Sequence, residues 1–209
     1  MLKIALINGS PKLGKSNSGL LLEKLEEFIG NGNDVFHYNI NSQPLSESEC
    51  AKICQMDALV FSFPLYVDSL PSHLLRLLVR LEKQQKNDGY VYVIANNGFF
   101  EGAQNCIAFE IIRNWCSRAN LHYGQGIAQG AGEMMKFLAS VPLDHGPLKN
   151  LGNAIAVLSK NIRAKSSGDD ILFSPNFPKF AWRFMATHVF WHTHARKNKL
   201  KIRDIRKTL

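Results

Sequence analysis

Short, nearly continuous apolar segments recur through the first two thirds of the chain. Such segments are expected of parallel strands that are covered on both faces, because neither side of the strand then meets water. They predict five strands, the last interrupted by glycines, over residues 2–8, 34–40, 57–63, 90–96 and 122–130.

Between these strands, apolar residues recur at the spacing of one helix face. The first such segment follows Ser18 and ends at a glycine stop, Gly30. A second is expected over residues 72–84, directly behind a proline, which is favoured at helix starts. Further helices are expected over about residues 103–119 and 151–165.

Repeated strand–helix units predict an α/β fold with an open, doubly wound parallel sheet. With five strands, the flavodoxin-like strand order 2-1-3-4-5 is favoured. The segment AKSSGDD, residues 164–170, has the composition of a linker. We therefore expect a flavodoxin-like domain over residues 1–165 and a C-terminal helical extension over residues 166–209.

The overall composition is that of an ordinary globular chain. Of the 209 residues, 45% are hydrophobic and 20% are charged, which allows a sizeable core. No apolar run approaches the ~18 residues that span a bilayer. The chain opens with a strand-like segment rather than a basic region, an apolar stretch and a cleavage site, so we expect a cytoplasmic protein.

The net charge of +8 is concentrated near the C-terminus. Residues 179–209 hold nine lysines and arginines against one acidic residue, Asp204, whereas residues 1–178 hold equal numbers of both signs. Residues 177–191 carry apolar side chains at helical spacing, with Trp182 and Trp191 adding bulk. The recurring residues are Phe177, Phe180, Ala181, Phe184, Met185 and Val189.

This aromatic and basic tail is expected to form a helix that docks on the body or on a second copy of the chain. Contact of the tail with a membrane surface is a secondary alternative, and no nucleic-acid partner is expected, because runs of charge are usually solvated faces.

The loop after the first strand, NGSPKLGKSNSG, has the composition of an anion site. In a Gly/Ser-rich turn that opens a helix, successive backbone N–H groups and the positive helix end converge on a phosphate. Residues 9–16 literally match the P-loop pattern G-x-x-x-x-G-K-[ST] of nucleotide triphosphatases. In the other interpretation, Ser10, Lys12 and the run from Ser16 to Ser18 hold the phosphate of a different ligand.

Three features weigh against a P-loop. Pro11 has no N–H group, which removes one donor from a cradle that depends on consecutive amides. A nucleotide triphosphatase also needs an acidic residue after another strand to hold Mg²⁺, but the third and fourth strands lead into SFPLY and ANNGF. Finally, these two loops carry patterns that a P-loop enzyme does not require. A P-loop nucleotide-binding protein is the least favoured alternative.

Three segments together resemble the NADPH-dependent FMN reductase family of flavodoxin-like NAD(P)H-dependent oxidoreductases. NGSPKLGKSNS, FPLYVDSLPSHLL and NNGFFEGAQN are similar to the family's phosphate loop G-S-P-[RK]-x-x-S-N-[ST], its P-x-Y-x-x-x-x-P segment and its Asn/Gly-rich loop. The resemblance covers about residues 1–130. Lys12 stands where arginine is common, and Gly14 and Lys15 are departures that create the P-loop match.

The resemblance implies that FMN binds where these loops meet, at the edge where open α/β sheets bind ligands. The FMN phosphate would be held by Ser10, Lys12, Ser16, Asn17 and Ser18. The ribityl chain and one edge of the ring would follow Pro64, Leu65, Tyr66 and Val67. The other side of the ring would be lined by Asn97, Gly98, Phe99, Phe100 and Glu101.

The residue types in these loops suit a flat ring. Gly98 would let the backbone approach closely, and Tyr66, Phe99 and Phe100 offer stacking area. Ordinary core packing is the alternative for each aromatic residue, because buried phenylalanine is common.

The implied function is an FMN-dependent NAD(P)H oxidoreductase that reduces a flavin, quinone, nitro or azo compound as second acceptor. Hydride transfer is the chemistry of the flavin, so no catalytic residue is expected from the protein. Homodimers are usual in the resembling family, and we expect one here. The alternative is a non-enzymatic electron carrier of the flavodoxin type. A neutral body with a basic tail weighs against a carrier, which usually presents an acidic face.

Metal sites are not expected. Cys50 and Cys54 supply only two of the four thiolates that an iron–sulfur cluster needs, so all four cysteines, Cys106 and Cys116 included, are interpreted as buried thiols. Likewise, His188, His192 and His194 are interpreted as packing residues, because no carboxylate or thiol accompanies them as a further zinc ligand.

Overall fold

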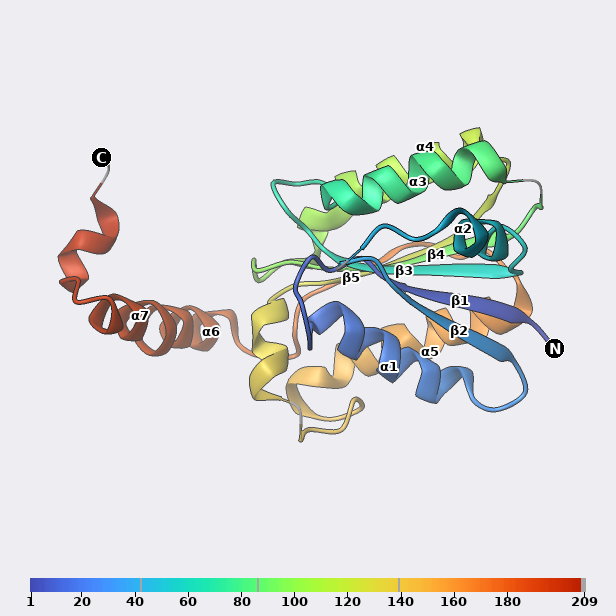
Figure 1. The fold of residues 1–209 in the computed structure, drawn as a ribbon. Coiled ribbons are helices and arrows are strands. Elements are labelled where there is room, and N and C mark those ends of the chain that lie inside the picture. The colour runs from blue at the N-terminus through green and yellow to red at the C-terminus, as the bar shows by residue number, and fades with distance from the viewer. Residues whose placement is uncertain (42, 86, 139, 208–209) are drawn as a thin grey trace. The chain divides into compact units, whose positions relative to one another are not determined.

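The computed structural model describes residues 1–41, 43–85, 87–138 and 140–207. The chain forms two compact units, a body from Met1 to Pro175 and an extension from Asn176 to Leu209 (Figure 1). Each unit is described by itself below.

The body is built on one parallel sheet. Its strands follow the order β2-β1-β3-β4-β5-β6, so the order expected for the first five is confirmed and a sixth strand is added beside β5. The strands are β1 (Lys3–Asn8), β2 (Asp34–Asn39), β3 (Ala58–Pro64), β4 (Tyr90–Asn96), β5 (His122–Gln129) and β6 (Ile171–Phe173).

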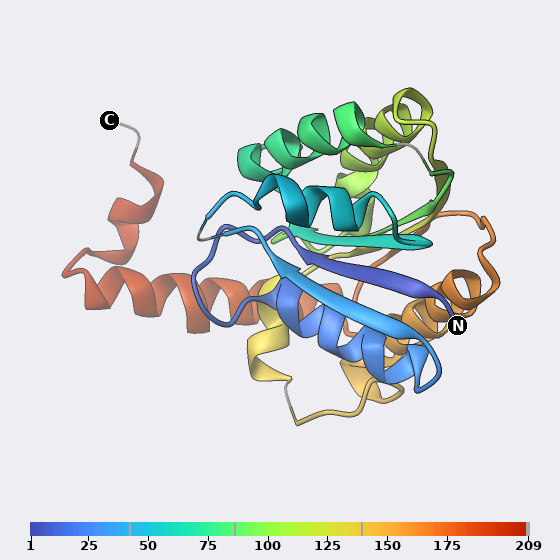
Figure 2. The same ribbon diagram turned by 45° about the vertical axis from the view of Figure 1, so that its right-hand side comes forward.

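Helices cover both faces of this sheet, as Figure 1 and Figure 2 show. On one face lie α1 (Asn17–Ile29) and α5 (Lys149–Ala164). The other face is covered by α2 (Glu47–Ile53), α3 (Ser72–Gln84) and α4 (Cys106–Arg118). Three short helical turns complete the body: η1 (Gly102–Asn105), η2 (Gly132–Phe137) and η3 (Gly146–Leu148).

Two apolar clusters, one on each face, make up the core. Phe61, Phe63 and Phe109 belong to the cluster under α2, α3 and α4, and Leu6 and Leu25 belong to the cluster under α1 and α5. Because successive side chains of a strand point to opposite faces, a continuous apolar strand supplies both clusters. This double burial explains why β1, β3 and β4 could be recognised from the sequence.

The segment expected to be a linker is instead fixed to the body. The Tyr92 hydroxyl donates to the carbonyl oxygens of Asn161 and Ser166, at 2.8 and 3.0 Å. The Asp170 carboxylate accepts from the Tyr123 hydroxyl at 2.9 Å and from the Gly126 N–H at 2.7 Å. The body therefore continues through β6 to Pro175, beyond the boundary at residue 165 that the sequence predicted.

The extension is helical, as expected. It contains α6 (Lys179–Met185), the π-helical segment η4 (Ala186–Trp191), α7 (His192–Lys197) and the short turn η5 (Ile202–Arg206). Within the described residues, neither unit has a helix that combines the length and the apolar character needed to cross a bilayer.

Gly102 offers a test of how tightly β6 is held. A Cβ at this position would lie closer than 3.0 Å to the backbone oxygens of Ala128 and Phe173, whereas a Cβ at Gly98 would meet nothing within 4 Å. We predict that Gly102→Ala lowers the free energy of unfolding by about 2–3 kcal/mol, because neither strand can yield without breaking its ladder. Gly98→Ala is the matched control and should leave the urea midpoint unchanged. Equal midpoints for both variants would contradict this packing.

Candidate functional site

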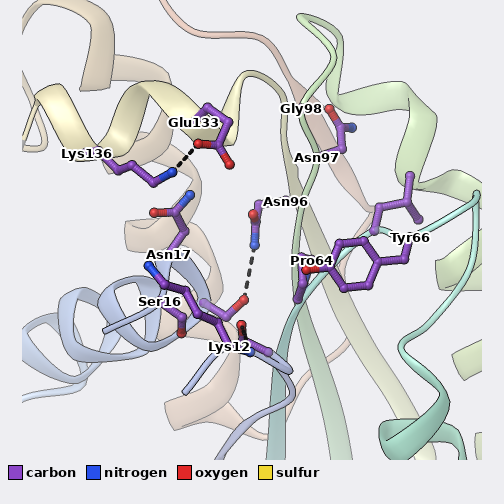
Figure 3. Close-up of a pocket in the computed structure, with 13 residues that line it drawn as sticks. Lys12, Ser16, Asn17, Pro64, Tyr66, Asn96, Asn97, Gly98, Glu133 and Lys136 are labelled. Atoms are coloured by element: carbon purple, nitrogen blue, oxygen red, sulfur yellow. Dashed lines mark hydrogen bonds and ion pairs between the residues drawn. The ribbon is translucent and has the colours of Figure 1, made fainter. Parts of the chain in front are cut away.

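A cavity lies beyond the carboxyl ends of β1, β3 and β4, with a volume of about 150 Å³ (Figure 3). Ten of the fourteen residues that the sequence predicted line it, and three further residues complete the lining. The predicted ones are Ser10, Lys12, Ser16, Asn17, Ser18, Pro64, Leu65, Tyr66, Asn97 and Gly98, and the further ones are Asn96, Glu133 and Lys136.

The side chain of Asn8, the last residue of β1, organises the first loop. Its Oδ1 accepts from the backbone N–H of Ser10 at 3.1 Å. Its Nδ2 donates to Asn39 Oδ1 at 3.0 Å and to Ser16 Oγ at 3.4 Å. Because Ser10 and Ser16 stand at the two ends of the loop, one buried amide closes the loop and ties it to β2.

Helix α1 presents its N-terminus to the cavity. Ser16 is the N-cap, and its Oγ accepts from the Gly19 N–H at 3.0 Å. The N–H groups of Asn17 and Ser18 have no acceptor within the helix, and no acidic side chain stands in the first turn. Together with the helix dipole, they make this end of the cavity positive.

Two lysines add to this positive potential. Lys12 extends from the loop along the same side of the cavity as Ser16 and Asn17 (Figure 3), and its ammonium forms no ion pair within the described residues. Lys136 lies nearby and pairs with Glu133. The described lining therefore contains one acidic side chain, which is already paired.

Asn96 joins three elements in the middle of the site. Its Nδ2 donates to Ser18 Oγ on α1 at 3.3 Å and to the Phe63 carbonyl oxygen on β3 at 3.2 Å. The backbone carbonyl oxygen of Asn96 accepts from the Leu65 N–H at 2.8 Å. The start of α1 and the loop after β3 are thereby held at fixed positions relative to β4.

The neighbouring Asn97 has an unused acceptor. Its Nδ2 donates to the Glu101 carbonyl oxygen at 3.1 Å. Its Oδ1 is buried and has no hydrogen-bond partner within the described part of the chain. A buried amide oxygen without a donor is costly, so a ligand with an N–H group is a natural partner for it.

The loop after β3 turns sharply beside the cavity. Tyr66 and Ser69 exchange two backbone hydrogen bonds of 3.1 and 3.0 Å, and Val67 and Asp68 between them adopt positive φ angles of 50° and 56°. Tyr66 faces the cavity and remains 49% exposed. Val67 is 98% exposed and does not line the cavity.

The three last residues predicted after β4 also lie outside the cavity lining. Phe99 is largely exposed, and Phe100 is buried, which favours the core-packing alternative for its ring. The carbonyl carbon and oxygen of Phe100 lie so close to Gly130 that a Cβ there would clash. Glu101 contributes its carbonyl oxygen to Asn97 and stands just before η1.

The residues missed from the sequence come from β4 and from η2. Gly132, the first residue of η2, accepts from Asn17 Nδ2 at 2.8 Å and donates its N–H to the Asn97 carbonyl oxygen at 2.7 Å. These bonds hold η2, with Glu133 and Lys136, against the first loop. The strand order could have predicted this position. β5 ends at the same edge of the sheet as β4, so the loop after β5 has to lie near the site.

The described lining consists of hydroxyls, amides, two lysines, a paired glutamate and a few apolar groups. No histidine or cysteine is among these residues. Such a set suits the binding of a phosphate and a flat polar group.

The described residues hold no group of three or more His, Cys, Asp or Glu side chains placed to bind a metal ion. Three cysteines are buried as expected, and burial raises the pKa of the Cys54 thiol to about 11 and of the Cys116 thiol to about 12. The expectation was wrong for Cys106, which is exposed at the start of α4.

Comparisons with known proteins establish the fold. No protein-family model matches the sequence, and no curated protein matches it either. Among solved structures, an NADH:FMN oxidoreductase is similar with a TM-score of 0.61 and 16% identity, over 80% of this chain and 91% of that chain. An FMN-dependent NADH-azoreductase from Bacillus anthracis, solved with FMN, is similar with a TM-score of 0.53 and 15% identity, over 80% of this chain and all (100%) of that chain.

A WrbA-like flavodoxin from Agrobacterium tumefaciens is similar with a TM-score of 0.54 and 13% identity, over 78% of this chain and 99% of that chain. At sequence identities of 13–16%, the similarity to these structures shows a shared backbone fold. The protein therefore has the flavodoxin-like fold that the strand pattern predicted.

We predict that Asn8→Ala destabilises the protein by about 1–3 kcal/mol, because several groups around the first loop lose a hydrogen-bond partner. Asn39→Ala is the matched control on β2: it removes only one of the same bonds from a more exposed position, and should cost less than half as much. Urea unfolding of both variants measures the difference. A smaller loss for Asn8→Ala than for Asn39→Ala would show that the first loop does not depend on this amide.

Proposed function

We propose that the protein binds FMN in this cavity and acts as an NAD(P)H-dependent oxidoreductase. The observation that carries the proposal is the meeting of three loops, after β1, β3 and β4, around one cavity whose described lining is positive at one end and amide-lined at the other. Solved structures of the same fold include an NADH:FMN oxidoreductase and an FMN-dependent NADH-azoreductase.

The first part of the fit concerns the phosphate. The monoester of FMN is close to a dianion at neutral pH, and the N-terminus of α1 offers unpaired N–H groups to it. The hydroxyls of Ser10, Ser16 and Ser18 and the ammonium of Lys12 line the same end of the cavity. In this proposal Lys136 assists them, with Glu133 holding its side chain in place.

The second part concerns the ring and the ribityl chain. Pro64, Leu65 and Tyr66 would follow the chain and one ring edge, and Gly98 would lie against the ring. The buried Oδ1 of Asn97, which lacks a donor within the described residues, matches the imide N–H of the isoalloxazine. The residues present thus fit FMN in both charge and hydrogen-bonding capacity.

When bound, FMN supplies the redox chemistry, accepting hydride from NAD(P)H and passing electrons to a small-molecule acceptor. The protein would hold the FMN in place and orient it. Tyr66 is half-exposed and the space beside Gly98 is open, so one flank of the site stays accessible to a second ligand. No side chain of the described lining needs to donate or accept a proton in this scheme.

Titration of the purified protein with FMN tests the phosphate contact. Lys12→Gln should weaken FMN binding roughly tenfold, because a charge-assisted contact to a phosphate is lost. Lys15→Gln is the matched control: this lysine is in the same loop but does not line the cavity, and its loss should change the Kd less than threefold. Riboflavin, which lacks the phosphate, should bind both variants equally. Equal losses for FMN and riboflavin would contradict the phosphate assignment.

Reduction of the bound flavin separates the enzyme from the electron carrier. We predict that NADH or NADPH bleaches the visible flavin band of the holoprotein within seconds and that an added quinone restores it. A holoprotein that keeps its colour in NAD(P)H but takes electrons from a separate reductase would identify a flavodoxin-type carrier instead. Protein that refuses FMN and binds Mg-ATP would restore the P-loop interpretation.

A further inference from the structure

The extension beyond the body contains one long helix. α6, η4 and α7 follow one another without a break from Lys179 to Lys197, as Figure 2 shows. After α7 the chain turns at Lys199, whose φ is 58°, and the Leu200 N–H donates to the Ala195 carbonyl oxygen at 2.9 Å. The short turn η5 follows.

Large apolar side chains of this extension are exposed to water. Phe180, Phe184 and Trp191 on the helix expose 78%, 62% and 57% of their surface. The same holds, at 40% or more, for Met185, Val189, Leu200, Ile202 and Ile205. A helix that exposes so many large apolar groups requires a partner, because soluble monomers rarely leave contiguous apolar surface uncovered.

The extension that carries these apolar groups is strongly basic. The extension contains nine lysines and arginines and one acidic residue, Asp204. That carboxylate is already committed to Lys207 at 2.9 Å and to the Lys201 N–H at 3.1 Å. Arg183, Arg196, Lys197, Lys199 and Arg203 make no ion pair within the described residues.

The charge distribution selects among possible partners. A second copy of the extension would bring two segments of like charge together. The body has equal numbers of acidic and basic residues, so it has no net negative charge to attract the extension. A nucleic acid would match the charge and could stack on the aromatic rings. It would leave the aliphatic groups of Val189, Leu200, Ile202 and Ile205 without an apolar environment.

We propose that the extension binds to the surface of a bilayer that contains anionic phospholipids. The described helices cannot cross a membrane, so the long helix would lie in the plane of the interface. Phe180, Phe184 and Trp191 enter the acyl boundary, and tryptophan is favoured at that depth. The lysines and arginines reach the lipid phosphates with their long side chains. The proposed membrane binding does not depend on whether FMN binds to the body.

The test is flotation of the full-length protein with two kinds of vesicle, phosphatidylcholine alone and an equal mixture of phosphatidylcholine and phosphatidylglycerol. The wild type should float with the mixed vesicles only, and should bind less as salt is raised, since salt screens charge attraction. The triple variant Phe180→Gln, Phe184→Gln, Trp191→Gln should bind the mixed vesicles at least roughly tenfold more weakly.

The triple variant Phe180→Leu, Phe184→Leu, Trp191→Leu is the matched control. Glutamine and leucine are both good helix formers, so the two variants differ in apolar character rather than in helix propensity. The leucine variant should retain most of the binding. Absence of wild-type flotation, equal flotation with both vesicle types, or equal binding by the glutamine variant and the wild type would each overturn the proposal.

Two other results would replace the lipid with a different partner. A concentration-dependent dimer that the glutamine variant loses, without vesicle binding, would identify a second copy as the partner. Binding of a single-stranded oligonucleotide without vesicle binding would identify a nucleic acid. Analytical ultracentrifugation and fluorescence anisotropy, run on the same protein, distinguish these cases.

Discussion

The carboxyl ends of parallel strands lie at one edge of the sheet. In this protein, several asparagine side chains are buried at that edge and need hydrogen-bond partners. Asn8 and Asn96 are almost fully buried there, and their side chains find partners in β2, α1 and β3. An unsatisfied buried amide costs about 1–3 kcal/mol, so these bonds fix the loops that they join. The shape of the cavity follows from this requirement, because the same amides determine where the loop after β1 and the first turn of α1 lie.

The chemistry available at the edge is determined by the same arrangement. A helix N-terminus, three serine hydroxyls and two lysines favour an anion at one end, and the buried Asn97 Oδ1 calls for an N–H donor at the other. The described lining offers no histidine, no cysteine and no unpaired carboxylate. The backbone dipoles, hydroxyls and lysines of this lining can bind and orient a redox cofactor, which would supply the reaction chemistry.

Local sequence patterns predicted the fold well where a segment carried its own signal. β1, β3 and β4 are apolar on both faces, and the loops behind them are rich in glycine and amides, so the strand order and ten of the lining residues followed. β6 was missed because three residues carry no period, and it is held by its ladder with the distant β5 and by the Asp170 contacts with Tyr123 and Gly126. Lys136 was missed because it lies on η2, far along the chain from the first loop. It comes near that loop only because β4 and β5 are neighbours in the sheet. For Phe100, the sequence alone cannot distinguish a core ring from a ligand-facing ring.

In the proposed function, the first turn of α1 and Lys12 bind the phosphate of a flavin mononucleotide. A crystal structure of the protein grown with FMN tests it most directly. We expect electron density for the phosphate against Ser16, Asn17 and Lys12, with the ring between the Tyr66 turn and Gly98. A phosphate bound elsewhere on the body, or crystals that exclude FMN at saturating concentration, would contradict it.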